Sequence, residues 1–459
     1  MCCVKGRQLI EVRCFDSFEK AAFLRNEVNA LNRASARPDP FSTFEFYQNF
    51  FRHDEDFPNG QDLCLWFLAA FDADRLIGYI ALKQVAQKVF GVKTYTLGFL
   101  VTHDTDRPHL VAKAEDLQRV SEAFYAYILS RKKEWSFLEF QQQDAASPLF
   151  PPPAALDLKN YLVREWPSME NGTIHLKWNT LAEYFKALSR NSRTNLRRLM
   201  RRLFDAGEVE FVASAHPATA LTLFELYRLI EPHSWKSKAQ ADIGRHPERI
   251  EYFKGLFDSK QPMRVSIQVL LLDGIPIAGL ITGTYLKGLY ALHIVYDERV
   301  SRLAPGSAML LMAVRQAIEG RFAFFNLLSG FSYYKLRWLA QMTETRIVQI
   351  YRKGSILFWR RVFGDWKRRH FSAKKAQAPV LFNPTRRDVS GEEATEVDNK
   401  IQLEVSAEER RRIAELIHLV RQGEGEFLSA AELIAAMPFD KQPGKPGKVK
   451  RVMGLKNSA

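Results

Sequence analysis

The hydrophobic pattern is clearest between residues 286 and 338. Residues 290–296 read YALHIVY, a β-rich and nearly continuous apolar run that predicts a buried strand. After the turn RLAPGSA at 302–308, leucine, valine and isoleucine recur at helical spacing, and residues 322–328 predict a further strand. The stretch therefore predicts a strand, a turn, an amphipathic helix and a second strand.

The turn at 302–308 has two interpretations. A strand that leads through a glycine-containing turn into a helix directs free backbone N–H groups and the positive end of the helix dipole at one place, which suits a phosphate. The same pattern fits an ordinary strand–helix–strand crossover without a ligand, because glycines are common in turns.

A similar order of elements occurs twice in the chain. Each half has two hairpin strands, a third strand, a long helix and a fourth strand. In the first half these are expected at 63–71, 76–85, 93–101, 113–132 and 137–141, and the second hairpin occupies 265–272 and 275–282. Asp273-Gly274 joins the second pair and is a strong hairpin signal. The halves share little residue identity, so either a tandem pair or two unrelated α/β units would explain the order.

The length of 459 residues exceeds what one core usually supports, which predicts several domains. We expect a first α/β domain over 1–155 and a second over 156–372 that contains an arginine-rich helix at 190–206. A polar linker at 373–400 would lead to a helical appendage with a disordered basic tail at 401–459.

Composition narrows the class of protein. A hydrophobic content of 46% indicates a globular chain with substantial cores. The 66 lysines and arginines exceed the 52 aspartates and glutamates, so the formal net charge of +14 favours anionic partners such as phosphate-rich molecules, an anionic membrane surface or nucleic acid. The sequence shows no membrane span, no signal peptide and no metal-binding cysteine spacing. We therefore expect a cytoplasmic protein with reduced thiols, with peripheral contact to the inner face of a membrane as an option.

Two predicted basic helices could contribute to such a membrane contact. The predicted helix at 190–206 carries Arg190, Arg193, Arg197, Arg198, Arg201 and Arg202 around an apolar face. It fits either a solvated surface or contact with phosphate, acidic lipid or nucleic acid. The predicted helix at 355–369 mixes aromatic and basic residues, so it could lie on a membrane surface or cover a core with its charged rim in solvent.

Several short motifs together suggest a family. They are SRNSRTNLRR at 189–198, HSWK at 233–236, DGIPIAG at 273–279, YD at 296–297, PG at 305–306 and YKLRW at 334–338. In this order they resemble the bacterial CelD/BcsL-like acyltransferases, which belong to the GNAT superfamily and are distantly related to the FemAB aminoacyltransferases. The resemblance covers residues 160–355 well and residues 8–150 only through the order of elements.

The resemblance implies tandem GNAT-like domains, each a mixed, mostly antiparallel sheet flanked by helices, followed by the helical appendage. The second domain would bind acetyl-CoA or another acyl-CoA as acyl donor, with its pyrophosphate on the turn formed by Arg302, Pro305, Gly306, Ser307 and Ala308. This turn departs from the family pattern by one extra residue and a proline. The counterpart at 103–113 contains no glycine, which suggests a degenerate first domain that walls the acceptor site.

Acyl transfer requires a base for the acceptor and donors for the thioester oxygen. Asp297 and His293 lie at the end of the central strand and are candidate bases, although Asp297 could simply cap the loop and His293 could be a core residue. Tyr334 and Lys335 are further catalytic candidates, which could instead fix the helix that contains them. The resemblance implies that Trp235 and Lys236 lie near the acceptor, and the other candidate substrate-binding residues are Arg193, Arg197 and Arg337. We expect no metal.

These observations favour an N- or O-acyltransferase that moves an acetyl or other acyl group from acyl-CoA to an amine or hydroxyl of a small molecule or glycan precursor. The cell-surface or exopolysaccharide precursor is implied by the resemblance alone. One alternative is a FemAB-like transferase that uses aminoacyl-tRNA, the one nucleic acid expected here. Another is a non-enzymatic scaffold that binds anionic membrane or polymer through its basic helices.

Overall fold

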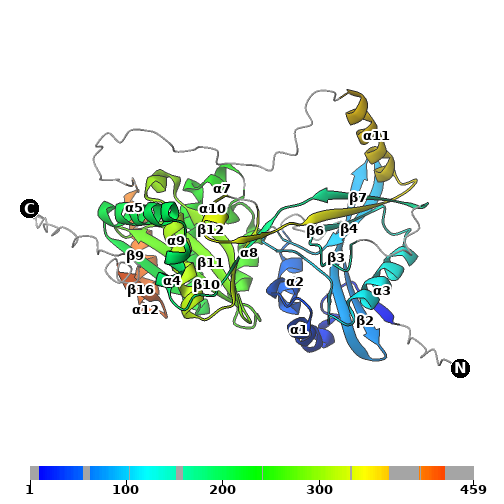
Figure 1. The fold of residues 1–459 in the computed structure, drawn as a ribbon, viewed down its shortest axis with the longest axis horizontal. Helices are drawn as coiled ribbons and strands as arrows, with labels where there is room; N and C mark the ends of the chain where they lie inside the picture. Colours follow the sequence, from blue (N-terminus) through cyan, green and yellow to red (C-terminus); the bar gives the residue numbers. More distant parts are fainter. Residues whose placement is uncertain are drawn as a thin grey trace, which may run out of the picture.

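The computed structural model describes residues 10–54, 63–102, 104–150, 159–239, 241–330, 333–371, 403 and 405–429. These residues form two mostly antiparallel sheets flanked by helices, which lie side by side in Figure 1. The expected mixed α/β fold with two sheets is therefore confirmed. None of the helices within the described ranges is long and apolar enough to cross a membrane.

The first sheet has the strand order β1-β2-β3-β4-β6-β15-β7, with β5 paired to β3. Its strands are β1 (Glu11–Phe15), β2 (Leu63–Asp72), β3 (Arg75–Val89), β4 (Val92–Phe99), β5 (Val111–Ala112), β6 (Phe137–Gln143), β7 (Tyr161–Pro167) and β15 (Arg346–Arg352). Associated with them are η1 (Ala22–Leu24), α1 (Arg25–Ala34), η2 (Pro40–Ser42), α2 (Phe44–Arg52), α3 (Leu117–Ser130) and α11 (Ile356–Phe371). Only β4 and β6 run parallel in this sheet among the described strands.

The second sheet has the order β14-β8-β13-β12-β11-β10-β9-β16. Its strands are β8 (Asn171–His175), β9 (Val209–Ser214), β10 (Arg264–Leu272), β11 (Ile275–Tyr285), β12 (Gly288–Tyr296), β13 (Phe324–Ser329), β14 (Gln341–Thr343) and β16 (Glu426–Ser429). Its helices are α4 (Leu181–Ala187), α5 (Arg190–Ala206), α6 (Pro217–Ile230), η3 (Glu231–His233), α7 (Trp235–Lys238), η4 (Ile243–Arg245), α8 (Pro247–Leu256), η5 (Glu298–Leu303), α9 (Pro305–Glu319), α10 (Tyr333–Arg337) and α12 (Ala407–Gln422).

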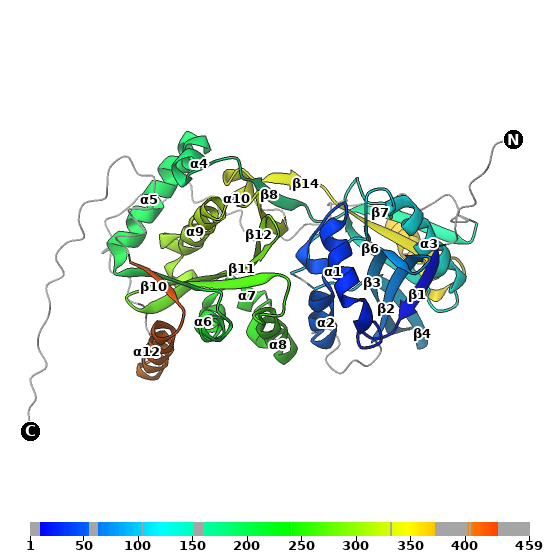
Figure 2. The same cartoon turned by 90° about the horizontal axis from the view of Figure 1, so that it is seen from below.

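Helices cover both faces of the second sheet. Figure 2 shows α4, α5 and α9 on one face and α6, α7, α8 and α12 on the other. Two apolar cores correspond to these faces: Met309 and Leu311 of α9 pack in one, and Leu223 and Tyr227 of α6 pack in the other. The hairpin between β10 and β11 turns at Asp273 and Gly274, which have φ values of 50° and 74°. This agrees with the sequence, because positive φ at both central residues favours Asp-Gly.

Sheet membership differs from the domain boundaries expected from the sequence. The strand β15 pairs with β6 and β7, so two segments of the expected second domain, 156–372, complete the first sheet. The strand β16 pairs with β9, and Ile413 and Val420 of α12 enter the core that contains α6. The described part of the expected appendage therefore belongs to the second sheet. The expected linker at 373–400 and the tail from 430 lie outside the described residues.

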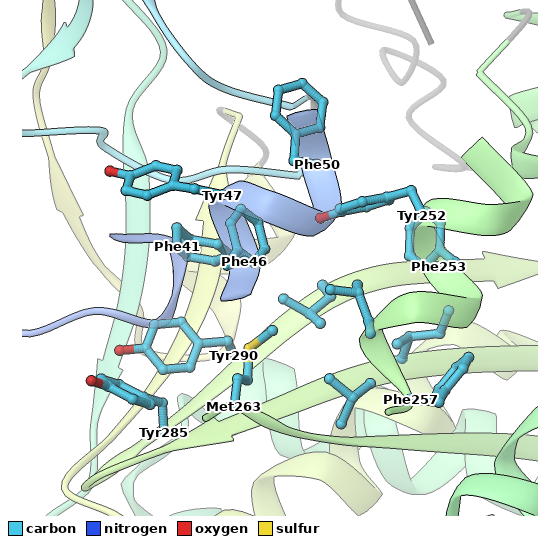
Figure 3. Close-up of a cluster of buried hydrophobic side chains, with 14 of the residues drawn as sticks. Phe41, Phe46, Tyr47, Phe50, Tyr252, Phe253, Phe257, Met263, Tyr285 and Tyr290 are labelled. Atoms are coloured by element: carbon cyan, nitrogen blue, oxygen red, sulfur yellow. The ribbon is translucent and has the colours of Figure 1, made fainter. Parts of the chain in front are cut away.

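The two halves share an aromatic core (Figure 3). The ring of Phe41 lies 5.7 Å from that of Tyr290, and the rings of Phe46 and Phe50 each lie 6.1 Å from that of Tyr252. Asn49 from α2 also donates to the Tyr252 carbonyl at 2.9 Å. Because burying large rings is strongly favourable, this contact fixes the halves against each other.

Candidate active site

The parallel strands β12 and β13 diverge in the middle of the second sheet. Their pairing extends only from Gly288–Phe324 to Tyr290–Asn326. Residues 291–296 of β12 continue beside β11, but no described strand pairs with their other edge. An extended molecule could therefore reach backbone groups between the two strands at this point.

The turn after β12 leads into α9. Asp297 caps the start of η5, Ala304 adopts a left-handed conformation with φ of 51°, and α9 starts at Pro305. The N–H groups of Ser307 and Ala308 donate to the Ala304 carbonyl at 2.9 and 3.4 Å. The expected strand, turn and helix are thus confirmed, and the helix N-terminus lies at the end of the central strand.

The turn before α9 offers a small set of donors to the phosphates of an acyl-CoA. Proline at 305 has no N–H, and the Ser307 and Ala308 amides are already directed at Ala304, so within the described turn Gly306 supplies the free helical N–H. Arg302 is exposed at the same turn. A β-carbon at Gly306 would lie 3.3 Å from the Tyr296 ring, which shows how closely the backbone approaches this ring. One amide, the helix dipole and one arginine suit a phosphate group, although they offer fewer donors than a complete glycine-rich turn.

Asp297 is held by its own turn. Its carboxylate accepts from the Arg299 backbone N–H at 2.9 Å and from Arg299 Nη2 at 2.7 Å, and the side chain is almost completely buried. The Asp297 N–H donates to the Ile277 carbonyl at 2.8 Å. This geometry matches the loop-capping interpretation of Asp297, because both carboxylate oxygens stabilise the start of η5.

A buried chain of polar side chains lies on the opposite face of the sheet from α9. Lys236 Nζ lies 2.5 Å from Nε2 of His293, and the Tyr227 hydroxyl lies 2.6 Å from Nδ1 of the same ring. His293 comes from β12, Lys236 from α7 and Tyr227 from α6. The candidate base and one candidate substrate-binding residue are therefore in direct contact. Tyr227 joins them, although no sequence pattern marks it as a candidate.

Charged residues surround the side chains of Lys236, His293 and Tyr227. Arg249 of α8 lies 3.5 Å from Asp104, which belongs to the loop after β4 in the first half. Glu231 accepts from the backbone N–H groups of Ile243 and Gly244 at 3.0 and 3.1 Å. All three residues are buried, so the first half contributes a carboxylate to the surroundings of Lys236.

Burial determines the protonation states of Lys236 and His293. It lowers the pKa of Lys236 to about 7, an effect that Arg249 reinforces and that Asp104 and Glu231 oppose. Burial and then the nearby Lys236 and Arg249 charges hold the pKa of His293 well below its usual value, so the ring is neutral. A neutral His293 that donates from Nδ1 to Tyr227 can accept from the Lys236 ammonium at Nε2. Lys236 can thus exchange a proton near neutral pH.

Lys335 has a different position. Its ammonium donates to the carbonyls of Leu328 and Ser329 at 2.9 and 3.2 Å, at the end of β13. Burial lowers the pKa of Lys335 to about 8, although Asp106 opposes the shift. Because Leu328 has a φ of 56°, this strand end is irregular, and Lys335 stabilises its carbonyl groups.

A buried network next to Lys335 joins the two halves. Asp106 from the first half accepts from Asn171 Nδ2 at 2.7 Å, Asn326 Nδ2 at 3.0 Å and Ser329 Oγ at 2.9 Å. Asn171 also donates to Asn326 at 2.9 Å. No local sequence pattern indicates this network, because the residues that form it are widely separated in the chain.

Most of the other candidates lie apart from Lys236. Arg193 donates to the carbonyls of Lys186 and Leu188 and so caps α4, and the Arg197 guanidinium lies 5.3 Å from the Phe185 ring. Both belong to α5, on the α9 face of the sheet.

Arg337 is exposed, and Trp235 is partly buried beside Lys236. The Tyr334 backbone lies in α10, but its side chain is outside the described parts of the structure. Among the described residues no group of histidine, cysteine, aspartate and glutamate side chains could hold a metal.

Comparison with known families agrees with this fold. The model for an acetyltransferase (GNAT) domain matches residues 190–336, which include α5, His293 and the start of α9. The expected GNAT-type acetyltransferase domain is therefore confirmed for this part of the chain. No curated protein matches the sequence.

Solved structures with similar folds share little sequence. A FemX crystal structure is 11% identical and has a TM-score of 0.46, with 71% of this chain and 95% of that chain covered. The structure of L-PGS from Bacillus licheniformis is 13% identical, with a TM-score of 0.43 and coverage of 74% and 95%. A tandem GNAT protein from the clavulanic acid biosynthesis pathway is 11% identical, with a TM-score of 0.41 and coverage of 76% and 99%.

Proposed function

We propose that this protein is an acyltransferase of the CelD/BcsL-like type, which moves an acetyl or other acyl group from acyl-CoA to an amine or hydroxyl of a cell-surface or exopolysaccharide precursor. The observation that carries the proposal is the contact of Lys236 with His293 on the central strand of the matched acetyltransferase domain. The acceptor class rests on the resemblance of the sequence motifs.

The geometry of β12 supports an extended acyl donor. Gly306 and Arg302 would hold its phosphates in the turn after β12, and His293 lies three residues before Tyr296, the last residue of that strand. At about 3.3 Å per residue, roughly 10 Å of strand separates His293 from the start of this turn. A donor that uses both places must therefore carry its acyl group far from its phosphates, as acyl-CoA does at the end of its pantetheine arm.

Lys236 provides the proton acceptor. With a pKa of about 7, about half of its amine is neutral at pH 7 and can take the proton that the acceptor nitrogen or oxygen loses on attack. The acceptor atom forms a bond to the thioester carbonyl carbon, the carbon–sulfur bond breaks, and the thiolate takes up a proton from Lys236 or from solvent. His293 and Tyr227 hold the lysine in position throughout.

The test measures release of free thiol from acetyl-CoA and longer acyl-CoA esters with a panel of amine and hydroxyl acceptors. We expect Lys236→Met to lower kcat by about 100-fold or more while acyl-CoA binding measured by calorimetry persists. Lys238→Met is the matched control, because Lys238 lies in the same short helix but is exposed and pairs with Glu298. Equal loss in both variants, or no acyl-CoA binding by the wild type, would contradict the proposal.

The exposed arginines of α5 allow a specific test of the alternative in which the donor is an aminoacyl-tRNA. Arg190, Arg198, Arg201 and Arg202 are exposed on this helix, on the same face of the sheet as the α9 turn. If the donor were an aminoacyl-tRNA, changing Arg198, Arg201 and Arg202 to glutamine would weaken tRNA binding and reduce its salt dependence. Binding of acyl-CoA that survives these changes, with no tRNA binding by the wild type, would favour the acyl-CoA donor.

A further inference from the structure

The helix α11 carries an exposed aromatic stripe. It extends from the end of the first sheet, away from the rest of the molecule (Figure 1). Trp359, Phe363 and Trp366 are 60%, 62% and 45% exposed. Their spacing of four and three residues places all three on one side of a helix, and the rings of Phe363 and Trp366 stack at 5.5 Å.

A different side of α11 holds the helix to the sheet. Leu357 is buried, and the Arg361 guanidinium lies 4.6 Å from the Trp166 ring of β7. Asp365 lies 3.3 Å from Arg361 and 3.4 Å from Arg164. These contacts already dock the helix, so the exposed aromatic side chains are not needed to hold it to the sheet.

The turn between β3 and β4 adds to the same end of the molecule. Phe90 is 82% exposed at its tip, and Val92 is exposed beside it. The preceding Val89 packs in one small cluster with Tyr351 and Leu357, so the tip adjoins the base of α11. Six of the twelve exposed large apolar side chains in the described residues, namely Phe90, Val92, Trp166, Trp359, Phe363 and Trp366, therefore occur on these neighbouring elements. Such clustering marks an interaction surface, because exposed apolar side chains are usually scattered.

The charges next to the stripe are cationic. At about 100° per residue, Arg360 and Lys367 lie along one edge of the aromatic stripe of α11. Arg360 and Lys367 are exposed, and Lys88 and Lys93 flank the hairpin tip. The helix's own carboxylate, Asp365, is already ion-paired on its inner side. An aromatic stripe bordered by cations with long side chains complements an anionic lipid surface, in which rings enter the headgroup layer and cations contact phosphates.

We propose that α11 and the β3–β4 turn dock the protein onto an anionic phospholipid bilayer. Trp359, Phe363 and Phe90 enter the interface between headgroups and acyl chains, and Arg360 and Lys367 contact lipid phosphates. This surface belongs to the first sheet and α11, outside the residues 190–336 that match the acetyltransferase domain. Its test is therefore independent of acyl transfer.

The experiment uses the full chain and sedimentation with vesicles of phosphatidylcholine alone or with roughly a third phosphatidylglycerol. We expect binding to the anionic vesicles at moderate salt, accompanied by a blue shift of tryptophan fluorescence. The triple variant Phe90→Ser, Trp359→Ser and Phe363→Ser should lower the partition coefficient at least tenfold. The double variant Arg360→Gln and Lys367→Gln should lower it on anionic vesicles only.

Two matched controls separate docking from general charge and hydrophobicity. Leu221→Ser with Leu419→Ser removes exposed apolar side chains from the other half, and Lys113→Gln with Lys260→Gln removes the same charge elsewhere. Both controls should bind vesicles like the wild type, and circular dichroism should show that all variants are folded. Equal binding by the triple variant and the wild type, or no binding by the wild type, would overturn the proposal. So would a wild-type oligomer that the triple variant converts to a monomer, because the stripe would then be a protein interface.

Discussion

Lys236 Nζ lies 2.5 Å from Nε2 of His293, and both side chains are buried between α6, α7 and the central strand β12. A lysine in such a place cannot retain its ordinary pKa, because burial disfavours its charge. The contact therefore places a lysine with a pKa of about 7 beside β12, which lies within the residues that match the acetyltransferase domain.

The first prediction concerns the pH dependence of acyl transfer. Only the neutral Lys236 amine accepts a proton, so kcat/KM should rise as pH increases through about 7 and then level off. The Lys236→Met variant should lack this rise. A pH–rate profile from pH 5.5 to 9 checks it, and a wild-type profile that is flat in this range would exclude Lys236 as the base.

The second prediction concerns stability. The folded chain holds Lys236 with a pKa of about 7, below the ordinary value of 10.5 that applies after unfolding. Between these values the unfolded chain binds more protons, so the free energy of unfolding contributed by this group rises with pH, by about 1.4 kcal/mol per unit. Below pH 7 both states are protonated and the contribution is constant.

Urea denaturation of the wild type and Lys236→Met at pH 6, 7, 8 and 9 measures this effect. The variant should be more stable at pH 6 and 7, because it buries no amine, and its advantage should shrink as pH rises. A constant difference between the two proteins across the series would show that Lys236 is charged in the folded state.

The third prediction concerns the junction of the two halves. Asp106→Ala removes the carboxylate that accepts hydrogen bonds from Asn171, Asn326 and Ser329, so these donors lose that partner. We expect a loss of about 3 kcal/mol or more, since each unsatisfied buried polar group costs about 1–3 kcal/mol. The exposed Asp74→Ala is the control, and chemical denaturation is the measurement. Similar midpoints for both variants would mean that the network adds little.

The fourth prediction concerns the α9 turn. Gly306→Glu places a carboxylate where a phosphate would bind and should abolish acetyl-CoA binding in calorimetry at moderate salt. Gly306→Ala should bind only slightly more weakly, because its β-carbon lies 3.3 Å from the Tyr296 ring and adds no charge. Binding of acetyl-CoA by Gly306→Glu with wild-type affinity would place the donor elsewhere.

Local patterns in the sequence correctly indicated much of the second sheet. The apolar run at 290–296, the Asp273-Gly274 turn and the helical spacing after Pro305 all correspond to structure, namely β12, the β10–β11 hairpin and α9. These features depend on neighbouring residues, since periodicity and turn propensity act over a few positions. The same patterns selected His293 and the α9 turn as candidates.

Other parts depended on contacts between distant segments. The strand β15 completes the first sheet only because its backbone pairs with β6 and β7. Lys236 and His293 are 57 positions apart, and Tyr227 and Asp104 lie on other elements that reach the same region. No local pattern specifies such tertiary contacts, because they depend on which faces of the helices and sheets pack together.

The sequence by itself therefore determined the order of the elements, the basic charge and the motifs of an acetyltransferase-like second half. Only the tertiary structure decided that Asp297 caps its own loop and that Lys236 is buried against His293. The physical reason is desolvation: a lysine becomes a base near neutral pH only when folding removes water from it, and that depends on every element packed around it.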